Sequence, residues 1–167
     1  ESSFFNGNLD HLSMINKKSK LPIIRKDFII DPYQILESKV FKADAILLIV
    51  SILNDNQIKE FINIANNHGL DCLVETHTKE ELNRAINIGY PIIGINNRNL
   101  KNLTVDINNT LNLIKNIPSG FTVVAESGIK NSEDIKKYND VGVFNFLIGE
   151  SILKAKNISK KIKQLLI

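Results

Sequence analysis

Short, uninterrupted apolar runs separated by amphipathic stretches are the feature that most restricts how this chain of 167 residues can fold. The runs are rich in Ile, Val and Leu without polar alternation, which is typical of strands buried on both faces of a parallel sheet. They recur about every 25 residues, a spacing that leaves room for one helix between successive strands. We predict strands at Leu21–Ile24, Ala45–Val50, Cys72–Val74, Ile92–Ile95, Thr122–Ala125 and Val143–Ile148.

The stretches between these runs carry helical periodicity and helix-start signals. Ile58, Phe61 and Ile62 recur at the spacing of one helix face. Asp31 before Pro32 predicts a cap followed by proline at the first helical position, and Thr78 with Glu81 predicts a capping box. We predict helices at Leu9–Asn16, from Pro32 onward, and at Gln57–His68, Lys79–Ile88, Asp106–Lys115 and Ser132–Tyr138.

This alternation predicts an α/β fold with right-handed parallel crossovers. No linker rich in proline or glycine divides the chain, so residues 1–167 are expected to form a single domain. Two architectures fit the pattern equally: an open, doubly wound sheet and a (β/α)8 TIM barrel. A helix with no strand before it stands at the start of the pattern, which suggests that part of the fold is missing.

Composition excludes several classes of protein. The formal net charge is only +3, and the lysines are scattered rather than gathered in a basic stripe, so we expect no nucleic-acid partner. Cys72 is the single cysteine, which excludes an internal disulfide and favours a buried thiol in a reducing, cytoplasmic compartment. Three scattered histidines give no zinc-ligand spacing. The apolar runs fall far short of the roughly 20 residues that a membrane-spanning helix needs, so no membrane association is expected.

Charged and amide side chains follow the predicted strands at their carboxyl ends, where both candidate folds place their active sites. Lys26, Glu75 and Glu126 each come directly or closely after a strand. A lysine flanked by carboxylates stays protonated and can act as a general acid, and a carboxylate in a partly dry pocket can accept a proton near neutral pH. The alternative is that each belongs to a surface ion pair.

Two glycine-containing segments follow the last two predicted strands and precede helix starts. They are Ser127-Gly128 and Gly149-Glu150. Glycine permits close approach of the backbone, and free N–H groups at helix starts bind anions, so this pair predicts a phosphate site. The carboxylate of Glu150 would have to point away from the phosphate. The alternative is that both glycines only permit tight turns.

Five segments resemble, in the same order, the motifs of the indole-3-glycerol phosphate synthase family, and together they extend over essentially the whole chain. Other phosphate-binding barrels share only the last two of these motifs. The segments are Leu21–Gln34 (LPIIRKDFIIDPYQ), Asp44–Ile49 (DAILLI), Gly94–Leu100 (GINNRNL), Ala125–Ile129 (AESGI) and Phe146–Ser151 (FLIGES).

The resemblance implies a (β/α)8 barrel and a carboxy-lyase of tryptophan biosynthesis that uses neither a metal nor an organic cofactor. It would close the ring of 1-(2-carboxyphenylamino)-1-deoxyribulose 5-phosphate with loss of CO₂ and water. Lys26 matches the general acid and Glu75 the carboxylate of the dehydration, while Asn96 and Glu126 match residues that orient the intermediate. The remaining matches are substrate contacts at Phe28, Leu47 and Arg98 and the phosphate cradle at Ser127, Gly128, Gly149 and Glu150.

The chain also departs from the family. Members begin with a helical extension and a first strand that carries a Lys-x-Ser-Pro motif, which would supply a second lysine; neither is present. Residues 1–7 resemble the segment after the second strand, so the strands here are expected to be the third to the eighth of the barrel, and activity of these residues alone is in question. A non-catalytic barrel remnant or interaction module, and another phosphosugar isomerase or lyase, are the alternatives. Fusion to or association with other tryptophan-pathway domains is left open.

Overall fold

The computed structural model describes residues 7–100 and 102–166. The described residues form two compact units. Unit 1 comprises the described residues up to Glu75 together with Asn87–Tyr90, and unit 2 comprises Thr76–Ile86 together with the described residues from Pro91 onward. The match of residues 1–7 to a family segment lies, apart from Gly7, outside the described residues.

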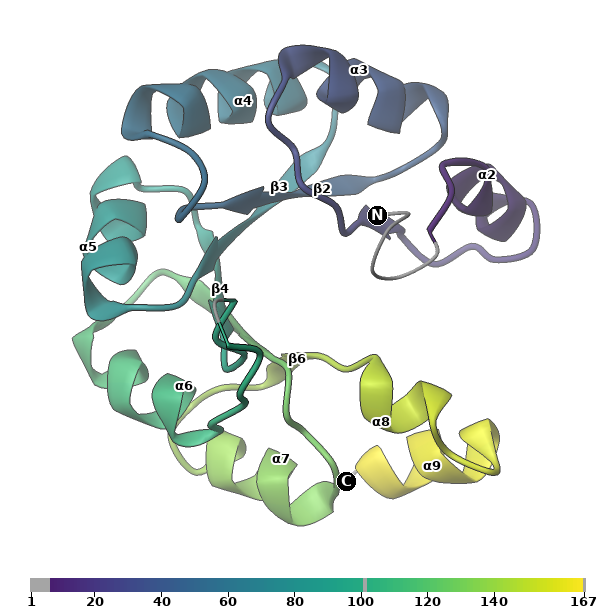
Figure 1. The fold of residues 1–167 in the computed structure, drawn as a ribbon, viewed down its shortest axis with the longest axis vertical. Coiled ribbons are helices and arrows are strands. Elements are labelled where there is room, and N and C mark those ends of the chain that lie inside the picture. Colours follow the sequence, from purple (N-terminus) through teal and green to yellow (C-terminus); the bar gives the residue numbers. More distant parts are fainter. Residues whose placement is uncertain (1–6, 101, 167) are drawn as a thin grey trace. The chain divides into compact units, whose positions relative to one another are not determined.

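Unit 1 is a parallel α/β unit in which β1 pairs with β2 and β2 pairs with β3. In Figure 1, helices α3 and α4 lie on one side of β2 and β3. Each of these helices begins at a capping box, formed by Asp31 and Gln34 for α3 and by Asn54 and Gln57 for α4. The elements are α2 (Asp10–Asn16), β1 (Ile24–Arg25), α3 (Pro32–Val40), β2 (Ala45–Ile49), α4 (Asp55–Asn67) and β3 (Asp71–Thr76), whose last residue belongs to unit 2.

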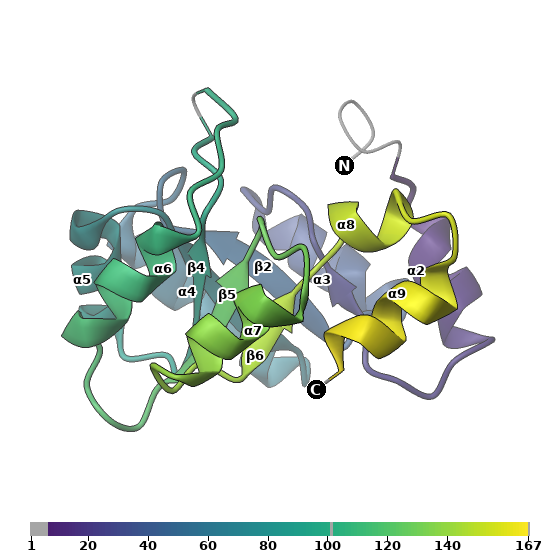
Figure 2. The ribbon, with the colours of Figure 1, turned by 90° about the horizontal axis from the view of Figure 1, so that it is seen from below.

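Unit 2 repeats this plan with β4 paired to β5 and β5 paired to β6, both in parallel. Figure 2 shows that the connection between β4 and α6 projects beyond the strand ends. An isolated antiparallel bridge between Arg98 and Val105 closes this connection into a hairpin-like excursion. The elements are α5 (Lys79–Ile88), which ends in unit 1, β4 (Ile92–Asn96), α6 (Asn108–Leu113), the 3-10 helix η1 (Ile114–Asn116), β5 (Thr122–Glu126), α7 (Ser132–Asn139), β6 (Asn145–Leu147), α8 (Glu150–Leu153) and α9 (Ile158–Leu165).

Nearly all apolar side chains of β2, β3 and β4 are buried, on both faces, as the sequence predicts, whereas the residues of β6 are exposed or half-buried. In unit 1 the core also includes the apolar face of α4, with Ile58, Phe61 and Ala65 almost fully buried. Among the described residues, no helix combines the length and apolar character needed to cross a membrane.

The predicted first and last strands are longer than the observed ones. Pro22 has no N–H to donate to a ladder, and the Ile23 N–H donates to the carboxylate of Asp44 at 2.8 Å, so β1 begins only at Ile24. Val143 lies in the turn that follows α7, where its N–H donates to the Tyr138 carbonyl at 3.0 Å, and β6 begins at Asn145.

The helices end close to the predicted limits, with two differences. The predicted helix Asp106–Lys115 is shorter as an α-helix, and its last turn tightens into η1. Helix α9 was not predicted at all, although Ile158, Ile162 and Leu165 stand at helical spacing after an Asn157 cap.

Candidate active site

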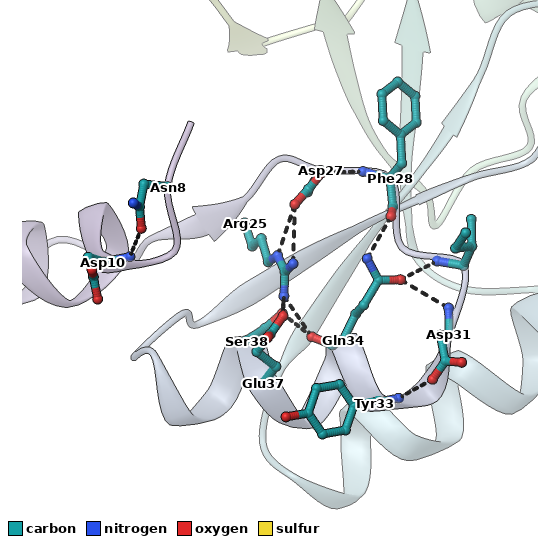
Figure 3. Close-up of polar contacts among 11 residues, drawn as sticks. Asn8, Asp10, Arg25, Asp27, Phe28, Asp31, Tyr33, Gln34, Glu37 and Ser38 are labelled. Carbon is teal, nitrogen blue, oxygen red and sulfur yellow. Dashed lines mark hydrogen bonds and ion pairs between the residues drawn. The ribbon is translucent and has the colours of Figure 1, made fainter. Parts of the chain in front are cut away.

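The segment that carries Lys26 is held by the buried side chain of Arg25, which precedes it (Figure 3). The Arg25 guanidinium lies 2.8 Å from the Glu37 carboxylate and 3.2 Å from the Asp27 carboxylate. It also donates to the Gln34 carbonyl at 3.0 Å and to the Ser38 hydroxyl at 3.1 Å. Arg25 therefore ties the residues on both sides of Lys26 to helix α3.

The backbone after Lys26 is fixed by the side chain of Gln34. Its amide nitrogen donates to the Phe28 carbonyl at 3.0 Å, and its amide oxygen accepts from the N–H groups of Ile30 and Asp31 at 2.8 and 3.0 Å. The Phe28 ring points away from the Arg25 contacts in Figure 3 and is 37% exposed. This apolar ring is therefore accessible on a loop whose backbone is constrained.

Lys26 and Glu75, both in unit 1, form a close ion pair. The Lys26 Nζ lies 3.0 Å from Glu75 Oε2, and the two side chains are 39% and 1% exposed. Glu75 is part of β3 rather than following it, directly opposite Ile49 of β2. Strand alternation puts Leu47, which is buried, on the same face as Glu75. At this place the exposed ammonium can donate a proton and the buried carboxylate can accept one.

In unit 2, Asn96 and Glu126 are the last residues of β4 and β5 and stand opposite each other in the register. Both are buried, and parallel neighbours of this kind project from the same face of a sheet. The Asn96 amide oxygen accepts from the Arg98 N–H at 2.9 Å. The structure thus brings together two polar residues that the sequence placed at separate strand ends.

Arg98 and Glu150 meet across unit 2. Arg98 Nη2 lies 2.7 Å from Glu150 Oε2, and Lys154 Nζ lies 2.6 Å from Glu150 Oε1. Hydrogen bonds from Lys154 and Arg98 hold the pKa of Glu150 below its usual value. The carboxylate is directed to these two cations, so its charge is partly offset.

The loop after β5 and the first turn of α8 are joined by a hydrogen bond from the Ser151 hydroxyl to the Ile129 carbonyl at 2.8 Å. Ser127 and Gly128 adopt φ values of 64° and 85°, and a Cβ on Gly128 would lie 2.6 Å from Val105 Cγ1. A Cβ on Gly149 would meet no heavy atom within 4 Å. Gly128 is thus required by the packing of the protein, whereas the space beside Gly149 is open.

The N-terminus of α7 is already occupied by the protein's own side chains. The Asn131 side chain accepts from the Asp134 N–H at 2.9 Å, and the Asp134 carboxylate accepts from the N–H groups of Lys130 and Asn131 at 2.9 and 3.3 Å. The backbone N–H groups of Lys130, Asn131 and Asp134 are therefore already hydrogen-bonded within the protein.

Some residues at these sites were not recognised from the sequence. Arg25 and Asn97 are buried polar side chains with several partners each, and single-sequence patterns carry little signal for such contacts. His77, which follows β3, lies with Nδ1 3.2 Å from the Glu81 carboxylate.

Solved structures of low sequence identity share the fold. 3-Hexulose-6-phosphate synthase from Salmonella typhimurium matches with a TM-score of 0.80 at 14% identity, over 94% of this chain and 77% of that one. KGPDC from Streptococcus mutans matches with a TM-score of 0.68 at 20% identity, over 94% of this chain and 76% of that one. The described strands run parallel and carry polar side chains at their carboxyl ends, and the similar solved structures share this fold. The chain is therefore a TIM-barrel-like α/β protein.

Within that class, sequence similarity identifies the family of this chain. Residues 1–165 match the family model of indole-3-glycerol phosphate synthase, and the chain belongs to that family. It is 51% identical over 164 residues to the indole-3-glycerol phosphate synthase of Acetivibrio thermocellus, covering 98% of this chain and 63% of that protein. It is 46% identical over 163 residues to the enzyme of Legionella pneumophila strain Paris, again covering 98% and 63%. The chain therefore spans about three fifths of the length of these relatives.

Proposed function

We propose that this chain carries most of the catalytic residues of an indole-3-glycerol phosphate synthase. The complete enzyme would convert 1-(2-carboxyphenylamino)-1-deoxyribulose 5-phosphate to indole-3-glycerol phosphate, CO₂ and water. The observation that carries the proposal is the Lys26–Glu75 pair, at 3.0 Å, in a chain that matches the family through residue 165. The aligned pair Asn96 and Glu126 supports it independently.

Lys26 and Glu75 are proposed to transfer the protons of the reaction. The aromatic carbon that bears the carboxylate attacks the substrate ketone, and the Lys26 ammonium donates a proton to the ketone oxygen. Loss of CO₂ then restores the aromaticity of the ring. The hydroxyl formed from the ketone then takes up a proton and leaves as water, while the neighbouring carbon of the new ring loses a proton, so this step consumes no net proton. The Glu75 carboxylate is suited to accept that proton because it lies beside the ammonium.

The other predicted site residues are proposed to bind and orient the substrate. Asn96 and Glu126 would hold polar groups of the intermediate, and Arg98 would assist with anionic groups. The exposed ring of Phe28, with Leu47, would contact the anthranilate ring. The phosphate group would bind mainly to backbone N–H groups of Ser127, Gly128, Gly149 and Glu150.

The six parallel strands are proposed to correspond to the third to eighth strands of a (β/α)8 barrel. The first two strands would come from sequence outside these 167 residues. The order of the motifs and the match to relatives over 63% of their length support this assignment. That residues 1–167 belong to a single domain stays a prediction.

The proposal is tested in a chimera in which this chain follows the part of the Acetivibrio thermocellus relative that precedes the matched region. EDTA-treated chimera should produce the indole fluorescence of the product from the carboxyphenylamino-deoxyribulose phosphate. Lys26→Ala in the same chimera is the control and should remove nearly all turnover. A folded chimera that yields no product at millimolar substrate would overturn the proposed function.

A further inference from the structure

Asn97 is a buried residue directly after β4, and every polar atom of its side chain has a partner. Its amide nitrogen donates to the Ser127 carbonyl at 3.0 Å and to the Tyr138 hydroxyl at 2.9 Å. Its amide oxygen accepts from the N–H and the hydroxyl of Thr110 at 3.1 and 2.9 Å. One side chain thus joins α6, α7 and the loop after β5.

The backbone of Asn97 extends the same connections. Its N–H donates to the Glu126 carbonyl at 2.9 Å, and its carbonyl accepts from the Asp106 N–H at 3.0 Å. Asp106 lies where the excursion between β4 and α6 returns, and Arg98 begins that excursion. Asn97 is therefore the point at which the loops after β4 and β5 are fixed to each other.

Tyr138 completes this arrangement. Its hydroxyl donates to the Ile107 carbonyl at 3.1 Å while accepting from the Asn97 amide. Burial raises the pKa of Tyr138, so the hydroxyl remains a donor throughout the neutral range. The contact holds Ile107 in place, and Ile107 is one of the side chains that closely approach Gly128.

The loop after β5 requires such support because its backbone is in an uncommon conformation. Ser127 has a φ of 64°, which is the left-handed region that residues with a side chain seldom adopt. Such conformations persist when surrounding contacts fix them. The hydrogen bond from Asn97 reaches the carbonyl of this residue, which is also the first residue of the proposed phosphate cradle.

We propose that Asn97 is a positioning residue for phosphate binding, because it fixes Ser127 and Gly128 in the backbone conformation in which their N–H groups serve the anion. This inference rests on the proposed phosphate site, and it goes beyond it by assigning the residue that holds the site in shape. Asn97 itself does not contact the phosphate, since its side-chain atoms are already bonded within the protein.

The test is a titration of the 167-residue chain with inorganic phosphate, followed through the amide NMR signals of Ser127 and Gly128. Asn97→Asp has nearly the same shape but replaces the donating nitrogen with an oxygen. It should raise the Kd for phosphate at least about tenfold, because the hydrogen bonds to the Ser127 carbonyl and to the Tyr138 hydroxyl both depend on that nitrogen. Tyr138→Phe removes only the hydroxyl and adds no charge that would itself repel phosphate, so it separates loss of the contact from charge repulsion; it should weaken phosphate binding by a smaller factor. Leu113→Ala, in the buried face of α6, is the control for lost stability.

The outcomes separate positioning from a general structural role. Leu113→Ala should keep the phosphate Kd within about twofold of the unaltered chain, even where its unfolding free energy falls as far as that of Asn97→Asp. Three results would overturn the inference: an unchanged Kd in Asn97→Asp, equal weakening by Leu113→Ala, or no phosphate response at Ser127 and Gly128. If Asn97→Asp does not fold, an unchanged Kd in Tyr138→Phe overturns it. A chimera without turnover, alongside phosphate binding that depends on Asn97, would reject the proposed function and keep this inference.

Discussion

The ammonium of Lys26 lies 3.0 Å from the carboxylate of Glu75, although the Lys26 side chain is 39% exposed and the Glu75 side chain only 1%. A buried carboxylate is costly unless charged or polar partners stabilise it. Lys26 therefore has a structural role in addition to its proposed catalytic one. A strand-end lysine of this kind contributes to stability even though it is not part of the apolar core.

Lys26→Met should lower the unfolding free energy of the 167-residue chain by about 1–3 kcal/mol, because it removes a charged partner from a buried carboxylate. Urea unfolding measures this change. Lys154→Met is the matched control, since its partner Glu150 is 56% exposed and surface pairs contribute about 1 kcal/mol or less. Equal losses of unfolding free energy in the two variants would show that burial of Glu75 does not strengthen its ion pair with Lys26.

In the chimera, Lys26→Met should also lower kcat by roughly 10²–10⁴, the contribution of a positioned general acid. Turnover is measured by indole fluorescence at saturating substrate, on protein shown to be folded by circular dichroism. A kcat within about threefold of the unaltered chimera would mean that Lys26 only stabilises Glu75 and transfers no proton.

The two cradle glycines should respond differently to alanine. In Gly128→Ala the new Cβ would lie 2.6 Å from Val105 Cγ1 at a φ of 85°, so the chain should be destabilised by roughly 1–3 kcal/mol. In Gly149→Ala the Cβ meets open space, so stability should change little while the phosphate Kd rises. Urea unfolding and phosphate titration of both variants give the comparison. Loss of stability in Gly149→Ala without any change in phosphate Kd would remove Gly149 from the proposed cradle.

Neutralising Glu150 should strengthen phosphate binding. Glu150→Gln removes a negative charge at the start of α8 and should lower the phosphate Kd by about two- to fivefold at low salt, with a smaller effect at about 1 M salt because of screening. Lys154→Met, which removes a positive charge beside the same carboxylate, should have the opposite effect. Weaker binding in Glu150→Gln would instead indicate that the Arg98–Glu150 pair is needed to shape the site.

The parallel strands and the residues at their ends could be predicted because local pattern determines both. Uninterrupted Ile, Val and Leu runs are sufficient to indicate buried strands, and residues at strand ends face the same edge whatever the details of packing. Glu75, Asn96 and Glu126 proved to be the last or nearly last residues of their strands. A shift of one residue would have turned each to the opposite face.

The supporting contacts could not be predicted because they depend on tertiary neighbours. Asn97 bonds to Ser127 and Tyr138, which are 30 and 41 residues away along the chain. The requirement for glycine at position 128 comes from Val105, on a different loop. Such partners become apparent only when the strands have set the distance between the loops.

Cys72 should make the stability of the chain depend on pH in the alkaline range. Burial, followed by the charge of Asp71, raises the pKa of the thiol from 9.0 to about 12. Between these values the unfolded chain loses the thiol proton while the folded chain keeps it, so the unfolded state binds fewer protons and stability falls as pH rises. The full contribution is present below pH 9 and is lost progressively toward pH 12.

Urea unfolding at about pH 8, 9 and 10 should show a steeper decline for the unaltered chain than for Cys72→Ala, with a difference of at most about 1.4 kcal/mol per pH unit. The difference between the two chains isolates the thiol from lysines and tyrosines that titrate in the same range, and parallel declines would show that the thiol ionises equally in both states.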